Sequence, residues 1–355
     1  MPIFDIFASH ESVPVTANGY TQLLLLHSHA CGNGSANAEP ADKKVVQSFL
    51  AKANAGRDLG HFKLLDDMKI AKVSDSAIDK LPEGAVLLSF KFTLAKRFLS
   101  RDDGVFFPLD NPLRRDHVFK VPFIPAATWK GNLRTAAIEQ LLLSEQATQG
   151  TDRFRLLQLF GDEKSDEDDS PLEDPARQHK LKHFLDKHAP ASKPEFEGLR
   201  TQRAQSIQIS PNEFHQKGRL RFFPSWFDTT ELDVLNPRNR KTRTGTLPIH
   251  LEAVPAGKTS VFTLLYVPFD LLGNPAEIAV ARRRDWKLIG EALAHMLLKS
   301  GFGAKKSSGC GRIRPKIEDL SLTWLSTTLT KQQAAPISDA TKLSELTNAF
   351  REGAE

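Results

Sequence analysis

Apolar positions mark two strands in this chain. Residues 86–94 read Val-Leu-Leu-Ser-Phe-Lys-Phe-Thr-Leu, an apolar run with partial alternation and many residues that favour β-structure. Residues 259–267 read Thr-Ser-Val-Phe-Thr-Leu-Leu-Tyr-Val and have the same character. Both segments are therefore predicted to be strands. Weaker patterns of the same kind predict short strands at residues 204–209, 219–223, 247–253 and 312–317.

Apolar residues at helical spacing predict two helices. Leu133, Ala137 and Leu141 recur every four residues in a stretch rich in helix formers, and Thr128 is the predicted N-cap. A second helix is predicted after Pro275, because the apolar residues that follow form a single stripe. That stripe consists of Trp286, Ile289, Leu293, Met296 and Leu297. We expect it to face the core and not a cofactor.

The order of these elements predicts the fold class. It runs strand, helix, strand, strand, helix, strand, which is the βαββαβ order of an α+β, ferredoxin-like (RRM-like) fold. In that fold two helices cover one face of the sheet, and the other face is open to ligands. The aromatic residues typical of an RRM are not at the positions that module would give them, so fold alone does not assign a function.

The predicted ferredoxin-like domain spans residues 85–320. It is interrupted at about residues 162–205 by an insertion that is acidic at first and has no sustained apolar period. Residues 1–84 form an N-terminal extension to which we assign no role, and residues 321–355 form a C-terminal tail.

Composition narrows the class of partner. The chain has 355 residues, of which 40% are hydrophobic, so it can bury a large core in one elaborated domain or two. The net charge of +5 hides two opposed regions. Residues 282–316 hold ten Lys or Arg against two acids, whereas residues 161–174 hold eight carboxylates and one lysine. This asymmetry favours an anionic partner on one face, and we expect the acidic run to be solvated.

Cysteine content and hydropathy predict the compartment. Cys31 and Cys310 are far apart and provide no disulfide framework, which is typical of a reducing compartment. The apolar run at residues 23–26 is too short to span a bilayer, and the first residues do not form a secretory signal. We therefore expect a cytoplasmic protein with no membrane function.

Glycines alternate with cations and hydroxyls in residues 300–314, which read Ser-Gly-Phe-Gly-Ala-Lys-Lys-Ser-Ser-Gly-Cys-Gly-Arg-Ile-Arg. Glycine allows positive φ and close approach, so successive N–H groups can point into one concavity. Lys305, Lys306 and Arg312 add positive charge. The pattern suits phosphate binding; the alternative is a mobile surface turn, because a lone glycine-rich loop is not specific.

A second basic segment lies at a predicted helix start. Lys130 and Arg134 are four residues apart and therefore share one helix face, near an N-terminus that favours anions. Together they suit a phosphate, and the alternative is ordinary surface charge. Trp129 can stack on a base, although a tryptophan at a helix start is more often part of the core.

Soft metal ligands occur without the spacing of a complete zinc site. His27, His29 and Cys31 have no second cluster to complete a tetrahedral site, so we expect no metal there. The histidines of the insertion are expected to be solvated; these are His179, His183 and His188.

Three short motifs follow one another in a fixed order. The first reads Asp-Asn-Pro-Leu-Arg-Arg-Asp at residues 110–116, followed by Pro-Phe-Ile-Pro at 122–125 and Trp-Lys-Gly-Asn-Leu-Arg at 129–134. The second reads Gly-Arg-Leu-Arg-Phe-Phe at residues 218–223, preceded by Leu-Phe-Gly at 159–161. The third reads Arg-Lys-Thr-Arg-Thr-Gly at residues 240–245, then Glu-Ala-Val-Pro-Ala-Gly at 252–257 and the glycine-rich loop at 301–311.

This ordered set resembles the RAMP superfamily of CRISPR-associated proteins, and within it the repeated backbone subunits of type III effector complexes. The resemblance covers roughly residues 86–318, apart from the insertion. It departs from the family pattern at residues 126–129, where Ala-Ala-Thr-Trp replaces Gly-Ser-Ser before the lysine. It departs again at residues 101–107, which replace a glycine-rich approach to the aspartate.

The resemblance implies a subunit that binds CRISPR guide RNA through its backbone and stacks with similar Cas subunits into a filament. It also implies metal-dependent cutting of a complementary target RNA, with Mg²⁺ or another divalent cation, by a loop aspartate that matches Asp110. A carboxylate can act as a base or hold hydrated Mg²⁺, and the alternative is that Asp110 caps the following Asn-Pro turn. The candidate RNA-binding residues are Thr128, Lys130, Gly131, Arg134, Arg114, Arg115, Arg240, Arg243, Gly301, Gly303, Lys305, Lys306, Ser307, Ser308 and Arg312.

Two other functions stay open at this point. The chain can be a non-catalytic structural or capping RAMP subunit, in which Asp110 only shapes a loop. It can also be a stand-alone RNA-processing endonuclease with a histidine base, but the recognisable motifs contain no well-placed histidine.

Overall fold

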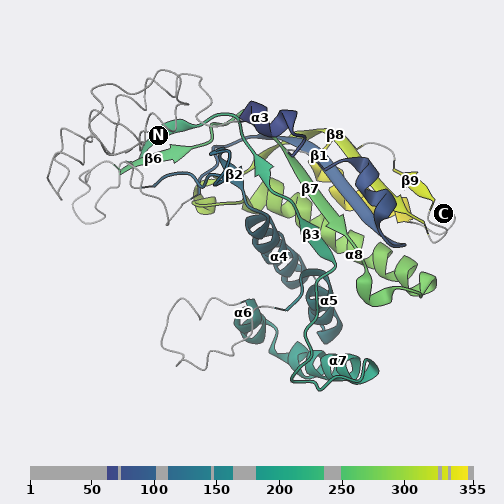
Figure 1. Cartoon of the computed structure of the whole chain (residues 1–355). Coiled ribbons are helices and arrows are strands. Elements are labelled where there is room, and N and C mark those ends of the chain that lie inside the picture. The colour runs from purple at the N-terminus through teal and green to yellow at the C-terminus, as the bar shows by residue number, and fades with distance from the viewer. Residues whose placement is uncertain are drawn as a thin grey trace, which may run out of the picture.

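The structure is a computed structural model that mixes helices with an antiparallel sheet (Figure 1). It describes residues 62–70, 73–100, 111–144, 148–162, 181–235, 249–326, 330–334 and 337–350. The strands are β1 (Val86–Leu94), β2 (Phe123–Ile124), β3 (Leu220–Phe222), β4 (Ser225–Trp226), β5 (Glu231–Leu235), β6 (Ile249–Ala253), β7 (Thr259–Tyr266), β8 (Ile313–Leu325) and β9 (Lys331–Gln333).

Helices occupy much of the remaining described chain. The α-helices are α3 (Phe62–Asp67), α4 (Ala126–Leu143), α5 (Gly150–Phe160), α6 (Leu181–His188), α7 (Lys193–Ser206) and α8 (Pro275–His295). The shorter or tighter helical segments are η1 (Asp75–Lys80), η3 (Pro190–Ser192), η4 (Phe269–Leu271), the π-helical turn η5 (Met296–Ser300), η6 (Lys306–Ser308) and η7 (Ala340–Phe350). Among the described residues, none of these helices combines the length and apolar character needed to cross a membrane.

The main sheet has five strands in the order β3-β7-β1-β8-β9, and all neighbouring pairs are antiparallel. β1 lies at its centre, with Phe90 opposite Phe262 of β7 and Leu88 opposite Leu322 of β8. Residues on both faces of β1 are buried, which explains why it reads as a nearly continuous apolar run. The predicted strands at residues 86–94 and 259–267 are confirmed as β1 and β7.

Helices α4 and α8 cover one face of the sheet (Figure 1). Alternate β1 side chains such as Phe90 and Phe92 point into this layer, as the period of two of a strand requires. Every residue of the predicted apolar stripe is buried, from Trp286 on α8 to Leu297 on η5. The second predicted helix is therefore confirmed, and its stripe belongs to the core.

The second face of the sheet is partly covered as well. Leu87 of β1 packs with Ile78 of η1 and with Val267 and Leu325, and all four side chains are buried. The expectation of an open ligand-binding face is therefore wrong for this part of the sheet, because residues ahead of β1 pack back onto it.

The structure corrects the prediction for residues 204–209, which were expected to be a strand. Helix α7 continues to Ser206, and Ala204 is buried against Leu157 of α5 and Phe214. Ile207 and Ile209, whose alternation indicated a strand, are instead exposed after the helix. The described part of the expected insertion also contains α6 and α7, and α7 packs on α5 in the lower part of Figure 1.

Helix α4 begins three residues before the predicted start. Its N-cap is Pro125, so Thr128 lies inside the first turn and does not cap the helix. At the other end of the chain, β8 extends to Leu325, so the expected boundary at residue 320 falls inside a strand. Segment η7, which comes after β9, packs closely on α8. A Cβ on Gly290 of α8 would lie 2.3 Å from the Leu343 carbonyl oxygen of η7.

Candidate RNA-binding surface

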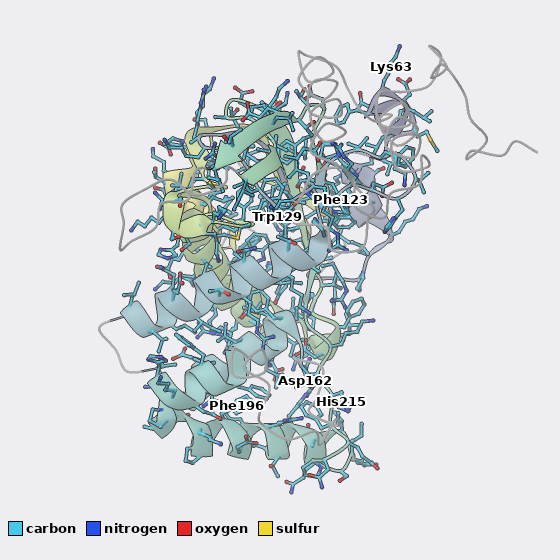
Figure 2. The ribbon with its side chains drawn as sticks, turned by 90° about the vertical axis from the view of Figure 1, so that its left-hand side faces the viewer. Lys63, Phe123, Trp129, Asp162, Phe196 and His215 are labelled. Carbon is cyan, nitrogen blue, oxygen red and sulfur yellow. The ribbon has the colours of Figure 1, made fainter. Side chains whose placement is uncertain are left out.

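Trp129 fixes the first half of α4 against the sheet. It is fully buried on the sheet side of the helix (Figure 2), and its Nε1 donates a 3.0 Å hydrogen bond to Ser225 Oγ in β4. Its indole ring meets the rings of Phe92 and Phe262 edge-on. Trp129 therefore belongs to the core and is not available to stack on a base.

The residues next to Trp129 on α4 are less buried. Lys130 and Arg134 are half-buried, and their spacing of four residues in the helix places them on one face, as predicted. Gly131 is exposed, and a Cβ added there would meet nothing within 4 Å. Thr128 is half-buried, and its carbonyl accepts a 2.8 Å hydrogen bond from Asn132 Nδ2.

The glycine-rich loop, residues 301–312, follows the π-helical turn η5 and packs tightly on the segment after β1. Gly311 N donates a 2.9 Å hydrogen bond to the Arg97 carbonyl, and a Cβ on Gly311 would lie 1.8 Å from the Phe302 carbonyl oxygen. A Cβ on Gly303 would lie 2.5 Å from the Leu99 carbonyl oxygen. Both glycines have φ near +70 to +80°, so any side chain there would be strained as well as crowded.

These contacts change the expected role of the loop backbone. The main-chain N–H groups of residues 302, 304, 308, 309 and 311 donate to protein carbonyls. They therefore do not point together at an external anion. Gly301 is buried, and its Cβ would meet the Cys310 carbonyl oxygen at 2.6 Å. Gly301 and Gly303 thus serve packing, and we leave both out of the RNA-binding surface.

The structure brings α4 and the loop together. Phe302 is fully buried with its ring centroid 4.5 Å from that of Trp129, so the two segments share one aromatic cluster. Above this cluster, Lys306 Nζ donates a 3.1 Å hydrogen bond to Asn132 Oδ1 on α4. Two segments more than 170 residues apart in sequence therefore form one surface.

We call this the basic surface, and it presents side chains of both segments. Lys305, Ser307 and Ser308 are exposed, whereas Lys306 and Arg312 are half-buried. Lys305 adopts the left-handed conformation, with φ of 55°, at the start of η6. The basic surface is defined by Lys130, Arg134, Lys305, Lys306 and Arg312 together with Arg221 of β3.

Arg221 was not predicted as part of the site. Its positive charge acts on Lys130, which shows that the two side chains lie close together. Burial lowers the pKa of Lys130 below its ordinary value of 10.5, and the positive charges of Arg134 and Arg221 lower it further. Arg221 Nη1 is held by the carbonyls of Gly218 and Leu220, at 2.6 and 2.9 Å. The cations repel one another, so an anion bound among them would relieve the repulsion.

The adjacent residues Arg114 and Arg115 have different environments. Arg114 is exposed, with its main-chain N–H donating to Ser100 Oγ at 2.9 Å. Arg115 is 5% exposed and forms a buried ion pair with Glu252, while its Nη1 donates to the Lys120 carbonyl at 3.2 Å. We therefore remove Arg115 from the candidate RNA-binding residues, because its charge is already compensated inside the protein.

The same ion pair anchors the chain beside the candidate catalytic residue. Glu252 also accepts a 3.0 Å hydrogen bond from Leu113 N, and its own N–H donates to the Asn111 carbonyl at 3.1 Å. Asp110 itself lies outside the described residues. In the part of the chain that the structure describes, no group of three or more His, Cys, Asp or Glu residues could hold a metal ion.

Arg240 and Arg243 also lie outside the described residues. The strands on either side, β5 and β6, form a two-stranded antiparallel sheet that extends away from the main sheet (Figure 1). The sequence predicted β6 but not β5. The remaining early candidates, His27, His29 and Cys31, are likewise outside the described residues, as is His179.

The second of the short motifs contains Arg219, which is the centre of a buried ionic cluster. Arg219 donates to both carboxylate oxygens of Asp270, at 2.8 and 2.5 Å, and to Asp285 Oδ2 at 2.7 Å. Tyr266 donates to the same Asp285 oxygen at 3.0 Å. Burial alone would lower the pKa of Arg219, but the carboxylates raise it above its ordinary value. Arg219 is therefore a structural cation.

The two segments of the second motif, residues 159–161 and 218–223, also pack against each other. A Cβ on Gly161 would lie 2.8 Å from Gly218 N, and a Cβ on Gly218 would lie 2.5 Å from the Phe160 carbonyl carbon. Beside them, Asp162 Oδ2 accepts a 2.7 Å hydrogen bond from Gln216 N, and Asp162 lies near His215 in Figure 2. The two glycines of the second motif therefore allow a close backbone contact of the fold.

Comparison with known proteins identifies the family of the chain. Searching the curated proteins gives no match. Among solved structures, the chain is similar to a chain in the cryo-EM structure of the Type III-B Cmr-beta bound to cognate target RNA. Sequence identity is 11% and the TM-score is 0.48, with 86% of this chain and 93% of that chain covered. The profile of the RAMP superfamily matches residues 63–314, which is more than half of the chain, and the chain therefore belongs to the RAMP superfamily.

Proposed function

We propose that this chain is the guide-RNA-binding subunit of a type III CRISPR effector ribonucleoprotein, and that the basic surface binds the sugar-phosphate backbone. The observation that carries the proposal is the contact of Lys306 with Asn132, which joins the two predicted basic segments into one surface. Lysine and arginine side chains bind phosphates through charge, and arginine adds paired hydrogen bonds. Membership of the RAMP superfamily supports a role in such a complex.

We further propose that the core is ferredoxin-like. Taken without the edge strand β9, the sheet order is β8-β1-β7-β3, with α4 following β1 and α8 following β7. Numbered along the chain, this is order 4-1-3-2 for a βαββαβ unit. The helices α5, α6 and α7 and the sheet of β5 and β6 are then additions to that unit. The proposal places the basic surface where α4 meets the loop before the last core strand.

The RNA-binding proposal is tested with the full chain and a fluorescein-labelled single-stranded RNA. Lys306→Ala should weaken binding by about 1 kcal/mol, roughly fivefold, and reduce the slope of log affinity against log salt by about one. The matched control is Lys187→Ala, which removes an exposed cation of α6 outside the basic surface. Equal effects of the two substitutions, or an affinity of the unaltered chain that does not depend on salt, would contradict the proposal.

We also propose that Asp110 supports cutting of a complementary target RNA in the assembled complex. Mg²⁺ prefers oxygen ligands, and a carboxylate can hold it or accept a proton. This part rests on the resemblance of residues 110–116 to the family motif, and no step through the metal is assigned. Asp110→Ala should abolish cleavage and leave guide binding intact, and EDTA should have the same effect. Unchanged cleavage by that variant would favour a structural or capping subunit.

A further inference from the structure

The end of α8 has an unusual geometry just before the glycine-rich loop. The helix continues from His295 into the π-helical turn η5, and Gly301 N donates a 2.7 Å hydrogen bond to the carbonyl of Met296, five residues earlier. Residues five apart point in different directions in an α-helix, whereas a π turn brings them close to alignment. The π turn therefore places Ser300 on the same side as His295.

Both of these side chains meet one carboxylate oxygen on α4. His295 Nε2 lies 2.9 Å from Glu139 Oε2, and Ser300 Oγ donates a 3.0 Å hydrogen bond to the same oxygen. The His295 side chain is 15% exposed, so this contact lies at the edge of the core. Ser300 is the residue directly before Gly301, where the glycine-rich loop begins.

The loop is held on α4 at a second point as well. Asn132, which accepts the hydrogen bond from Lys306, precedes Glu139 by seven residues, which is about two helical turns or roughly 10 Å. Asn132 Nδ2 donates to the Thr128 carbonyl, so the Asn132 side chain is itself fixed with Oδ1 toward the loop. Phe302, which lies between Ser300 and Lys306 in the sequence, packs on Trp129 one helical turn before Asn132.

We propose that Glu139 is a positioning residue that aligns the glycine-rich loop along α4, so that Lys305 and Lys306 face the RNA phosphates. This inference rests on the RNA-binding function proposed above. A carboxylate close to an RNA-binding surface repels phosphates, and its removal should strengthen binding if it had no other role. Because Glu139 also holds His295 and Ser300 by hydrogen bonds, we expect its replacement by alanine to weaken RNA binding instead.

The experiment compares two substitutions of Glu139 in the full chain, with binding measured on the same labelled single-stranded RNA. Glu139→Gln removes the charge but keeps an oxygen that can accept both hydrogen bonds. Glu139→Ala removes both contacts. We expect Glu139→Gln to bind RNA at least as tightly as the unaltered chain, and Glu139→Ala to bind about tenfold more weakly.

Three further variants complete the design. Ser300→Ala should weaken binding in the same direction, and combining it with Glu139→Ala should add little, because both act through one contact. Gln140→Ala, one residue further along α4, is the matched control and should leave affinity unchanged. All variants are measured well below their thermal unfolding midpoints, so that affinity is not confused with stability.

The outcomes separate this inference from the function on which it rests. Tighter binding by both Glu139 variants would overturn the positioning role and leave the RNA-binding surface in place, provided that Lys306→Ala still weakens binding. Equal weakening by Glu139→Gln and Glu139→Ala would also overturn it, because the glutamine keeps the acceptor. If Lys306→Ala has no effect, the proposed function itself fails.

Discussion

The two halves of the basic surface are supported in different ways. Helix α4 presents Lys130 and Arg134 from a regular backbone whose hydrogen bonds are local, and Gly131 beside them has open space around its Cα. The glycine-rich loop presents Lys305 and Lys306 from a backbone held by close contacts with distant residues, such as Gly311 with the carbonyls of Arg97 and Phe302. The charge is similar, but we expect the loop to depend far more on tertiary packing than the helix does.

The largest expected effect comes from the aromatic contact that joins the halves. Phe302→Ala should lower the free energy of unfolding by about 3–5 kcal/mol, because a fully buried ring leaves a cavity between the loop and Trp129. Urea unfolding followed by circular dichroism measures this loss. Phe269→Ala is the control, since that ring is 48% exposed. A loss no larger than the control's would mean that the loop is not anchored through Phe302.

A pair of glycine substitutions compares the halves directly. Gly311→Ala should cost at least about 2 kcal/mol of unfolding free energy, since φ is +69° and the new Cβ would clash with the Phe302 carbonyl. Gly131→Ala should instead stabilise the protein by about 0.5–1 kcal/mol, because alanine is the better helix former and nothing opposes its Cβ. Thermal unfolding of both variants checks the signs, and equal signs would contradict the contrast.

The smallest effect concerns the protonation of the helical half. Because burial and neighbouring cations lower the pKa of Lys130, the side chain loses its charge at a lower pH than an ordinary lysine does. RNA affinity should therefore fall as pH rises through this lowered pKa, before 10.5 is reached, by less than about threefold at a half-exposed site. Lys130→Met should remove this part of the pH dependence in an anisotropy titration, whereas an unchanged pH profile would show that Lys130 does not contact the RNA.

The same lowered pKa has a defined effect on stability. In the unfolded chain Lys130 binds its proton more tightly than in the folded protein, so the unfolded state holds more protons between the two pKa values. The contribution of Lys130 to the free energy of unfolding therefore rises as pH increases through that window. Bound phosphate would oppose this by raising the pKa of Lys130 again. Stability and RNA affinity should thus respond to alkaline pH with opposite signs.

The periodicity of apolar residues along the chain correctly predicted the central strands and the buried face of the second helix. Strand β1 was predicted at its observed bounds, and the stripe from Trp286 to Leu297 was correctly assigned to the core. Residues 204–209 were predicted wrongly, because Ile207 and Ile209 alternate as in a strand, although Ala204 packs from a helix onto α5. Only the contact of Ala204 with Leu157, which is distant in sequence, distinguishes a helix from a strand here.

The candidate site shows the same division. Lys130, Arg134, Lys305 and Lys306 could be selected because two short segments concentrate cations and hydroxyls at suitable spacing. Glu139 carried no signal, since the role we propose for it depends on contacts with His295 and Ser300, which lie more than 150 residues away along the chain.

The sequence by itself determined the central strands, the apolar stripe of α8, the two basic segments and the order of motifs that places the chain among the RAMPs. Only the tertiary structure decided which cations stay at the surface. Arg114 is exposed while Arg115 is paired with Glu252, and the loop meets α4 through Lys306 and Asn132. The physical reason is that helix and strand patterns arise from neighbours along the chain, whereas burial and charge compensation arise from residues that folding brings together.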